Sequence, residues 1–249
     1  MKLAKKILIG IIALILLLFI AGVVFIKSKN QPLPVGSNPE VADQLANDML
    51  VALDKPGFDS THYIKWDFAG RNQYVWDKVK NYAEITMGYD IVLLNLNEIT
   101  GKAYNRGIEI VGPAKDELIQ KAWTNWCNDS FWLIAPYKVF DPGTNRSIVD
   151  LEDGKKGLLV SYASGGVTPG DSYLWILNSN NVPGQWKMWV SNIPWGGAVS
   201  TWEDWITLYS GAKIATKHNL GIIQVIISDL MAGEDLSAIG LDTNIFDPL

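Results

Sequence analysis

The stretch that decides the fold lies at residues 157–190 and reads GLLVSYASGGVTPGDSYLWILNSNNVPGQWKMWV. It contains three short runs rich in β-branched and aromatic residues, at 158–162, 172–177 and 186–190. Clusters of Gly, Pro, Asn and Asp separate these runs and permit tight reversals of the chain. The pattern predicts three antiparallel strands joined as a meander.

The middle strand of this meander is apolar on both faces. With the two-residue period of a strand, Tyr173, Trp175 and Leu177 point to one side. Leu174 and Ile176 point to the other side. An antiparallel sheet with one face in water would carry polar residues at alternate positions. We therefore expect a helix, a second sheet layer or an apolar ligand to cover the second face.

The rest of the chain shows further strand patterns and two helices. Apolar residues recur at helical spacing over residues 41–53 and 113–128, and residues 100–102 are predicted to form a turn. Strand patterns occur at 61–68, 73–77, 82–87, 89–96, 199–205, 213–220 and 221–229. The sequence therefore predicts an α+β fold in which one large curved antiparallel sheet of about ten strands, an incomplete barrel, is covered by two helices.

These patterns divide the chain into four parts. Residues 1–29 form the expected membrane segment, and residues 30–38, rich in Pro, Gly, Ser and Asn, form a linker. The half-barrel domain is expected over residues 39–230. Residues 231–249 have weak periodicity and are expected to form a C-terminal tail without a clear element.

Residues 7–26, ILIGIIALILLLFIAGVVFI, contain no charge and no proline. A helix of this length spans about 30 Å, the hydrocarbon thickness of a bilayer. Three lysines precede it and two follow it, and with the α-amino group counted this bias places the N-terminus in the cytoplasm. A cleaved signal peptide has a shorter apolar region, and a lipoprotein signal needs a cysteine where Val23 stands. We expect an uncleaved, single-pass anchor in the inner membrane, with the C-terminal domain on the periplasmic side.

The charge of the chain is unevenly distributed. The formal net charge is −5, with 21 basic and 26 acidic residues. Residues 1–29 carry five of the lysines and no acid, so residues 30–249 carry 16 basic and 26 acidic side chains, a net charge of −10. Phosphate backbones repel such a body, and we therefore expect no nucleic-acid partner.

No motif in the sequence identifies a reaction. Two histidines cannot build a three-histidine zinc site, although a mixed site with carboxylates is not excluded. Gly165 and Gly170 have phosphate-loop spacing, but an aspartate follows where that loop needs a lysine. The single cysteine, Cys127, is expected to be a small buried apolar group. We expect no metal and no cofactor, and we assign no catalytic residue.

The two histidines are expected in different surroundings. His62 shares a predicted strand face with Ile64 and Trp66, which is typical of a buried core residue. His218 follows Lys217 in a segment that resembles a polar turn.

Tryptophan is unusually frequent, with eleven residues in the chain. Most of these large rings are expected to fill an interface between sheet and helix. Alternatively, some of them line an apolar cavity for an acyl chain or stack on sugar rings. The candidate ligand-binding residues are the aromatic ones on predicted strand faces: Trp66, Phe68, Tyr74, Trp76, Tyr173, Trp175, Trp186 and Trp189.

The order of elements and three short runs carry a resemblance to known proteins. The runs are Asp-Ser-Phe-Trp at 129–132, Phe-Asp-Pro-Gly at 140–143 and Trp-Lys-Met-Trp at 186–189. The chain resembles the outer-membrane lipoprotein carrier and receptor proteins (the LolA/LolB-like fold). It is still more similar to uncharacterised extracytoplasmic proteins of Bacteroidota-type bacteria.

The resemblance implies a fold and a kind of ligand. In the carrier family, an incomplete barrel lidded by helices holds lipoprotein acyl chains in an apolar cavity. The carrier loses its signal and the receptor is lipid-anchored, whereas this chain has an apolar anchor helix. We therefore transfer no individual functional residue.

Three hypotheses for function follow. The first is a membrane-tethered extracytoplasmic protein that binds an apolar ligand, a lipid or a lipoprotein acyl chain, without catalysis. The second is an envelope hydrolase that uses paired carboxylates, which the sequence alone cannot pair. The third is a structural or interaction module without a ligand, in which every tryptophan belongs to the core.

Overall fold

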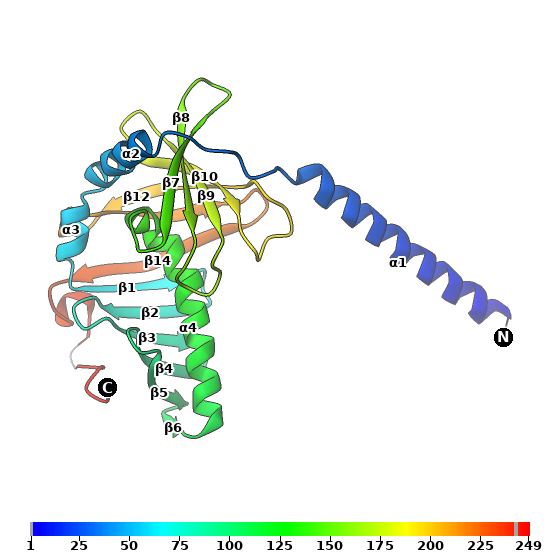
Figure 1. Cartoon of the computed structure of the whole chain (residues 1–249). Coiled ribbons are helices and arrows are strands. Elements are labelled where there is room, and N and C mark those ends of the chain that lie inside the picture. The colour runs from blue at the N-terminus through cyan, green and yellow to red at the C-terminus, as the bar shows by residue number, and fades with distance from the viewer. Residues whose placement is uncertain (1, 242–243) are drawn as a thin grey trace.

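The structure is a computed structural model that describes residues 2–241 and 244–249 (Figure 1). An α+β body contains two antiparallel sheets, and one long N-terminal helix projects away from it. The helices are α1 (Lys2–Lys29), α2 (Pro39–Ala52), α3 (Lys55–Ser60) and α4 (Pro113–Ile134), with short 3₁₀ helices η1 (Ala135–Lys138) and η2 (Ser237–Ile239).

The larger sheet has nine strands in the order β12-β13-β14-β1-β2-β3-β4-β5-β6. Their bounds are β1 (Tyr63–Phe68), β2 (Asn72–Asp77), β3 (Tyr82–Met87), β4 (Asp90–Asn95), β5 (Thr100–Asn105), β6 (Ile108–Ile110), β12 (Glu203–Thr207), β13 (Lys213–Asn219) and β14 (Gln224–Gly233). The smaller sheet has five strands in the order β11-β10-β9-β8-β7. Their bounds are β7 (Thr144–Asp150), β8 (Lys156–Tyr162), β9 (Ser172–Leu177), β10 (Pro183–Trp189) and β11 (Ala198–Thr201).

The α+β class and the large antiparallel sheet are confirmed, but the prediction of a single sheet was wrong. The meander at residues 157–190 builds a sheet of its own with β7 and β11. Strands that follow one another in the chain pair with each other, except between β6 and β7, where α4 intervenes, and between β11 and β12, where the chain passes from the smaller sheet to the larger one. The chain then returns to the free edge of the larger sheet beside β1. Over the described residues, neither sheet closes into a barrel.

Helix α4 connects the two sheets. It packs against β3, β4 and β5 of the larger sheet, and Phe131 near its end stacks on Trp186 of the smaller one. The sequence pattern predicts the end of this helix at Asn128, whereas it continues to Ile134. The added turns bury Leu133 and Ile134, so the apolar run after Asn128 is helical. The α-helix ends as Pro136 enters the 3₁₀ helix η1.

The alternation predicted for the first strand is confirmed. Ile64, Trp66 and Phe68 are buried in the main core, together with the apolar face of α2. Lys65 and Tyr63 lie on the opposite face and are half-buried. The core therefore lies between the inner faces of the two sheets, with α2 and α4 packed into it.

The outer face of the larger sheet is covered by the C-terminal segment. Val75 on β2 forms a second apolar cluster with Ile239 and Phe246. The segment that shows no clear element in the sequence thus docks as a cover on the sheet. The boundary expected after residue 230 falls inside β14, which runs through Gly233.

The second face of β9 is covered without an additional layer. Leu174 pairs across the strands with Leu159 and is only 3% exposed. A side chain at Gly157 would collide with Leu174, so this glycine leaves the space that the leucine fills. Leu151 closes the same space from the β7–β8 turn. Leu174 is therefore buried by residues of its own sheet and of the adjoining turn, because Gly157 leaves space for its side chain.

Three local predictions were wrong because tertiary pairing decided them. Residues 100–102 begin strand β5 rather than a turn, since they pair with β4. His62 precedes β1 and is exposed, with its Nδ1 3.2 Å from the carbonyl oxygen of Glu234. His218 lies on β13 and is fully buried rather than placed in a polar turn.

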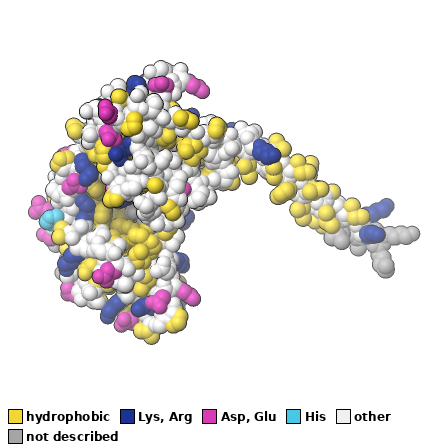
Figure 2. Space-filling model, viewed as in Figure 1, with side chains coloured by type: hydrophobic (Ala, Val, Ile, Leu, Met, Phe, Trp, Pro, Cys, Tyr) yellow, Lys and Arg dark blue, Asp and Glu magenta, His cyan; other side chains and the backbone are white. Residues whose placement is uncertain are grey.

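Helix α1 is long and apolar enough to cross a membrane by its length and composition. None of its apolar window is buried in the body. Figure 2 shows it as a rod of hydrophobic surface that leaves the body, with basic side chains near each end. Lys27 and Lys29 lie in its last turn.

The linker after α1 is docked on the body rather than free. Gln31 N–H donates to the carbonyl of Gly196 at 2.9 Å, and the indole Nε1 of Trp189 donates to the carbonyl of Gln31 at 2.9 Å. Ser37 forms a β-bridge with Ile148 on β7. Residues 30–38 therefore follow the surface of the smaller sheet.

Candidate functional site

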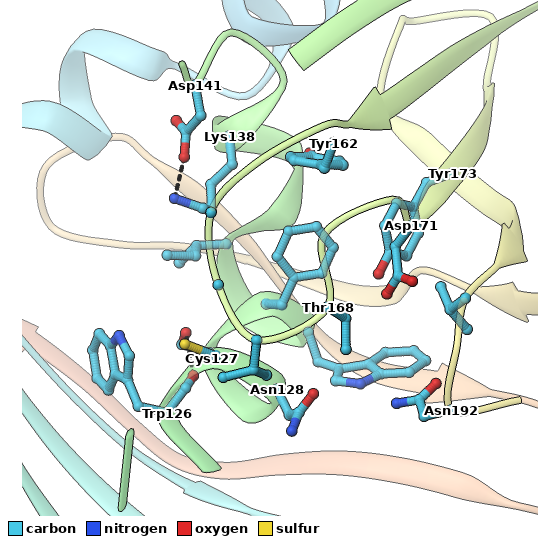
Figure 3. Close-up of a pocket in the computed structure, with 18 of the residues that line it drawn as sticks. Trp126, Cys127, Asn128, Lys138, Asp141, Tyr162, Thr168, Asp171, Tyr173 and Asn192 are labelled. Atoms are coloured by element: carbon cyan, nitrogen blue, oxygen red, sulfur yellow. Dashed lines mark hydrogen bonds and ion pairs between the residues drawn. The ribbon is translucent and has the colours of Figure 1, made fainter. Parts of the chain in front are cut away.

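A cleft of about 540 Å³ lies between α4 and the loops of the smaller sheet (Figure 3). One end reaches Trp76 on β2 and Leu96 directly after β4 of the larger sheet. The other end reaches the β8–β9 loop at 163–171 and the β10–β11 loop at 190–197. The cleft therefore follows the junction between the two sheets.

Helix α4 supplies one wall of this cleft. Trp123, Cys127, Phe131 and Ile134 line it, and three- and four-residue steps bring these positions to one side of the helix. Trp126 borders the same wall and packs its ring 5.4 Å from Trp76 of the larger sheet. The helix thus presents an apolar stripe to the cleft while it packs on the sheet.

The smaller sheet supplies the opposite wall. Tyr173 on β9 and Met188 on β10 are cross-strand partners, and both line the cleft. The ring of Trp186 lies 4.7 Å from that of Tyr173. Phe131 of α4 packs 5.0 Å from Tyr173 and 6.0 Å from Trp186. The two walls therefore meet in a group of aromatic rings at the base of the cleft.

Two buried polar groups on the cleft walls have no hydrogen-bond partner among the residues that the structure describes. They are the hydroxyl of Tyr162 and the indole Nε1 of Trp186. Burial raises the pKa of the Tyr162 hydroxyl well above its usual value, so the group keeps its proton. Both groups are donors whose hydrogens have no acceptor in the described part of the chain.

The charged side chains of the cleft already form interactions with other groups of the protein. Lys138 forms an ion pair with Asp141, drawn as the dashed line in Figure 3. Asp171 accepts a hydrogen bond of 3.0 Å from the backbone N–H of Ser191. The two carboxylates that line the cleft are thus held by separate partners from separate segments.

Cys127 is half-buried on the cleft wall. Burial raises the pKa of its thiol to about 11, a shift that the nearby Lys138 charge reduces. A nucleophilic cysteine needs the opposite shift, because the thiolate is the reactive form. The geometry is consistent with the expected apolar role of Cys127.

The structure separates the eight aromatic residues that the sequence proposes for ligand binding. Trp76, Tyr173 and Trp186 line the cleft. The other four strand residues with inward rings are packed in the core: Trp66, Phe68, Tyr74 and Trp175. Trp189 lies on the opposite face of β10 and borders an open groove beside residues 30–33.

Sequence reasoning missed the helical half of the site. Phe131, Trp132 and Tyr162 line the cleft but were not among the proposed residues. The helical stripe of α4 could have indicated the first two, had the helix been extended beyond Asn128. Tyr162 could be found only from its place at the end of β8.

A second polar feature anchors α4 outside the cleft. Asp129 is buried and accepts hydrogen bonds from Tyr74 Oη at 2.6 Å and from Asn72 Nδ2 at 2.9 Å. Burial raises the pKa of this carboxyl, and the two donors and Arg71 oppose the shift. The network fastens the helix to β2.

His218 belongs to an aromatic cluster behind the cleft. Its ring lies 4.4 Å from that of Trp202 and 5.2 Å from that of Trp132. Its Nδ1 lies 3.1 Å from the carbonyl oxygen of Thr201. Burial lowers its pKa to about 4, so the imidazole is neutral near neutral pH. Over the described ranges, no group of three or more His, Cys, Asp or Glu side chains is placed to hold a metal ion.

No protein-family model matches the chain. No curated protein matches it either.

Proposed function

We propose that this protein is a membrane-anchored, extracytoplasmic protein that binds an apolar ligand, a lipid or a lipoprotein acyl chain, in the cleft beside α4, without catalysis. The observation that carries the proposal is the cleft itself, whose two walls are largely aromatic and aliphatic. Its volume of about 540 Å³ falls within the range of roughly 300–1,000 Å³ for small-molecule sites.

The polar groups of the cleft favour an acyl compound over a pure hydrocarbon. Tyr162 Oη and Trp186 Nε1 are buried donors without an acceptor in the described part of the chain. The carbonyl oxygens of an ester or a carboxylic acid would accept from them. The apolar walls would then hold the hydrocarbon chain, whose burial supplies most of the binding free energy.

We propose a likeness to the lipoprotein carriers. A large antiparallel sheet with a helix across one face is the arrangement expected of an incomplete barrel lidded by helices. We propose that the larger sheet and α4 correspond to that half-barrel, and that the smaller sheet closes the cavity from the side.

The proposed location of the protein rests on the properties of helix α1. Its apolar run is long enough to span a bilayer, and its flanking lysines favour a cytoplasmic N-terminus. The body would then lie on the periplasmic side of the inner membrane. A reporter enzyme fused after Leu249 that is active only in the cytoplasm should stay inactive, and activity of this fusion contradicts the orientation.

Binding is tested on the full-length protein purified in detergent. A fluorescent polyene fatty acid should bind saturably and accept energy from Trp186, which lines the cleft. Mass spectrometry of an organic extract should find co-purified lipid. The absence of both results would refute the proposal.

Matched variants locate the binding. Tyr162→Phe removes one buried donor and should weaken acyl binding about 5- to 10-fold, the value of one hydrogen bond. Cys127→Trp places a large ring on the cleft wall and should abolish binding. Tyr209→Phe and Tyr209→Trp are the controls, because Tyr209 is 50% exposed and does not line the cleft. Equal binding by all four variants would place the ligand elsewhere.

A further inference from the structure

The end of α1 is fixed to the same loop that forms the mouth of the cleft. The helical hydrogen-bond pattern continues to Asn30, whose N–H donates to the carbonyl of Ile26 at 3.0 Å. The side-chain oxygen of Asn30 accepts from Gly196 N–H at 2.7 Å, and Gln31 N–H donates to the Gly196 carbonyl at 2.9 Å. No free residue therefore separates α1 from the β10–β11 loop.

An aromatic contact between α1 and the β10–β11 loop indicates how deep this loop would lie in a bilayer. The ring of Trp195 lies 6.1 Å from that of Phe25 in an edge-to-face arrangement. Phe25 is in the last turn of the apolar run, so in a bilayer it lies near the boundary between hydrocarbon and headgroups. Tryptophan is enriched at this boundary. The loop with Trp195 would thus lie in the interface.

The composition of the neighbouring segments fits such a surface. The linker at 30–38 and the β10–β11 region at 190–201 contain no Asp, Glu, Lys or Arg, and the β8–β9 loop at 163–171 contains one such residue, Asp171 at its end. The rest of the body is strongly acidic. Residues from all three segments line one open groove, and Asp171 is the one charged residue among the described residues that line it.

The groove leads into the cleft. Asp171 and Val190 line both of them, and Asn192 and Ile193 of the same loop line the cleft. The groove also borders Leu33 of the linker and Pro169 of the β8–β9 loop. The β10–β11 loop, yellow in Figure 1, lies on the side of the body where α1 ends. The cleft therefore opens on the side from which the anchor helix leaves the body.

We infer that the β10–β11 loop is a membrane-docking element and that the groove beside it is a portal through which an acyl chain passes from the anchoring bilayer into the cleft. This inference rests on the proposed function. It adds the source of the ligand, the lipid of the same membrane, and it assigns a fixed orientation to the body. Because the linker is short and bound to the body, it would keep the portal at the membrane surface.

Depth-dependent fluorescence quenching tests the position of the loop. Full-length protein with Cys127→Ser and Asn192→Cys is labelled with bimane and placed in phosphatidylcholine nanodiscs that contain a lipid with a nitroxide near its headgroup. The matched control carries the label at Ile108→Cys on β6, which is also exposed. Label at residue 192 should be quenched at least threefold more strongly than label at residue 108.

An insertion separates orientation from folding. Eight Gly and Ser residues placed between Lys29 and Asn30 leave the contacts of residues 30–31 intact but release the body from α1. Quenching at residue 192 should fall to the level at residue 108. Equal quenching at the two positions without the insertion would overturn the inference.

Binding of the acyl probe by the unlabelled parent protein, measured in nanodiscs of the same composition, separates the two proposals, because Cys127 and Asn192 both line the cleft. Bound acyl probe without quenching at residue 192 means that the cleft faces away from the bilayer, which overturns the portal and leaves the proposed function standing. Quenching without bound probe overturns the proposed function and the portal together. Quenching with bound probe, both reduced at least threefold by the insertion when the probe is supplied in the bilayer, supports the inference.

Discussion

The hydroxyl of Tyr74 on β2 donates a hydrogen bond of 2.6 Å to Asp129 Oδ2 in the C-terminal part of α4. Asn72 Nδ2 donates to the same oxygen at 2.9 Å. Beyond this point α4 also reaches the smaller sheet, where Phe131 and Trp132 pack against Trp186. The bonds to Asp129 therefore fix the helix at the junction where the cleft forms.

Tyr74→Phe tests the anchoring of α4. The variant should lower the free energy of unfolding by about 1–3 kcal/mol, because a buried carboxylate loses one of its donors. Urea denaturation followed by circular dichroism measures the change. Tyr209→Phe, an exposed position, should stay within about 0.5 kcal/mol of the parent protein. Similar losses in both variants would show that the Asp129 network is not anchoring the helix.

His218 should make the stability depend on pH in the acidic range. Burial lowers its folded-state pKa from 6.5 to about 4, so between these values the unfolded chain binds the proton and the folded chain does not. The contribution of His218 is therefore complete above pH 6.5 and is lost as the pH falls toward 4. The loss is about 3 kcal/mol, on the order of 1.4 kcal/mol per pKa unit.

The contribution of His218 is measured as the difference between the parent protein and His218→Gln at several pH values. Carboxylates such as Asp129 titrate in both proteins, so their effect cancels in the difference. The gap in free energy of unfolding should shrink as the pH falls from 7 to 4. His62→Gln is the control, because His62 is exposed. A gap that is constant with pH would contradict the prediction.

Trp186 should dominate the stability of the junction between the sheets. It is 1% exposed, and its ring packs against those of Phe131, Trp132 and Trp202. Trp186→Ala should cost about 3–5 kcal/mol in denaturant unfolding. Trp189→Phe on the opposite face of the same strand keeps a ring and removes only the bond to Gln31, so it should cost about 1 kcal/mol. The reverse order would contradict this account of the core.

The thiol of Cys127 should react slowly and with a steep pH dependence. Burial raises its pKa to about 11, so at pH 8 roughly one molecule in a thousand carries the thiolate. The rate of reaction with a disulfide reagent should rise about tenfold per pH unit between pH 8 and 10. An acyl ligand in the cleft should slow the reaction further. A rate that levels off below pH 9.5 would indicate an ordinary exposed thiol.

Much of the architecture could be predicted from local pattern. The three strands within 157–190, the alternation of Ile64, Trp66 and Phe68, and the helix at the start of the body all follow from periodicity and turn residues. The elements that the sequence did not predict have weaker strand patterns. Strand β7 is polar at most positions, and β5 begins in residues that resemble a turn. Their pairing with neighbouring strands decides their structure.

The candidate site was only partly predictable, because it is formed by elements distant in the sequence. Tyr173 and Trp186 could be named from their strand faces, and both line the cleft. Trp66 and Trp175 show the same alternation but are packed in the core. Periodicity identifies the side chains that share a face. It does not show which faces meet closely and which leave a space between them.

The sequence by itself determined the antiparallel strands, the amphipathic helix α2, the apolar helix α1 and the acidic character of the body. These features depend on the order of side chains within one element, and that order is local. The tertiary structure alone decided that the strands form two sheets, that α4 spans both, and that the linker is bound to the mouth of the cleft. These features depend on contacts between segments far apart in the chain, whose free energies no local pattern records.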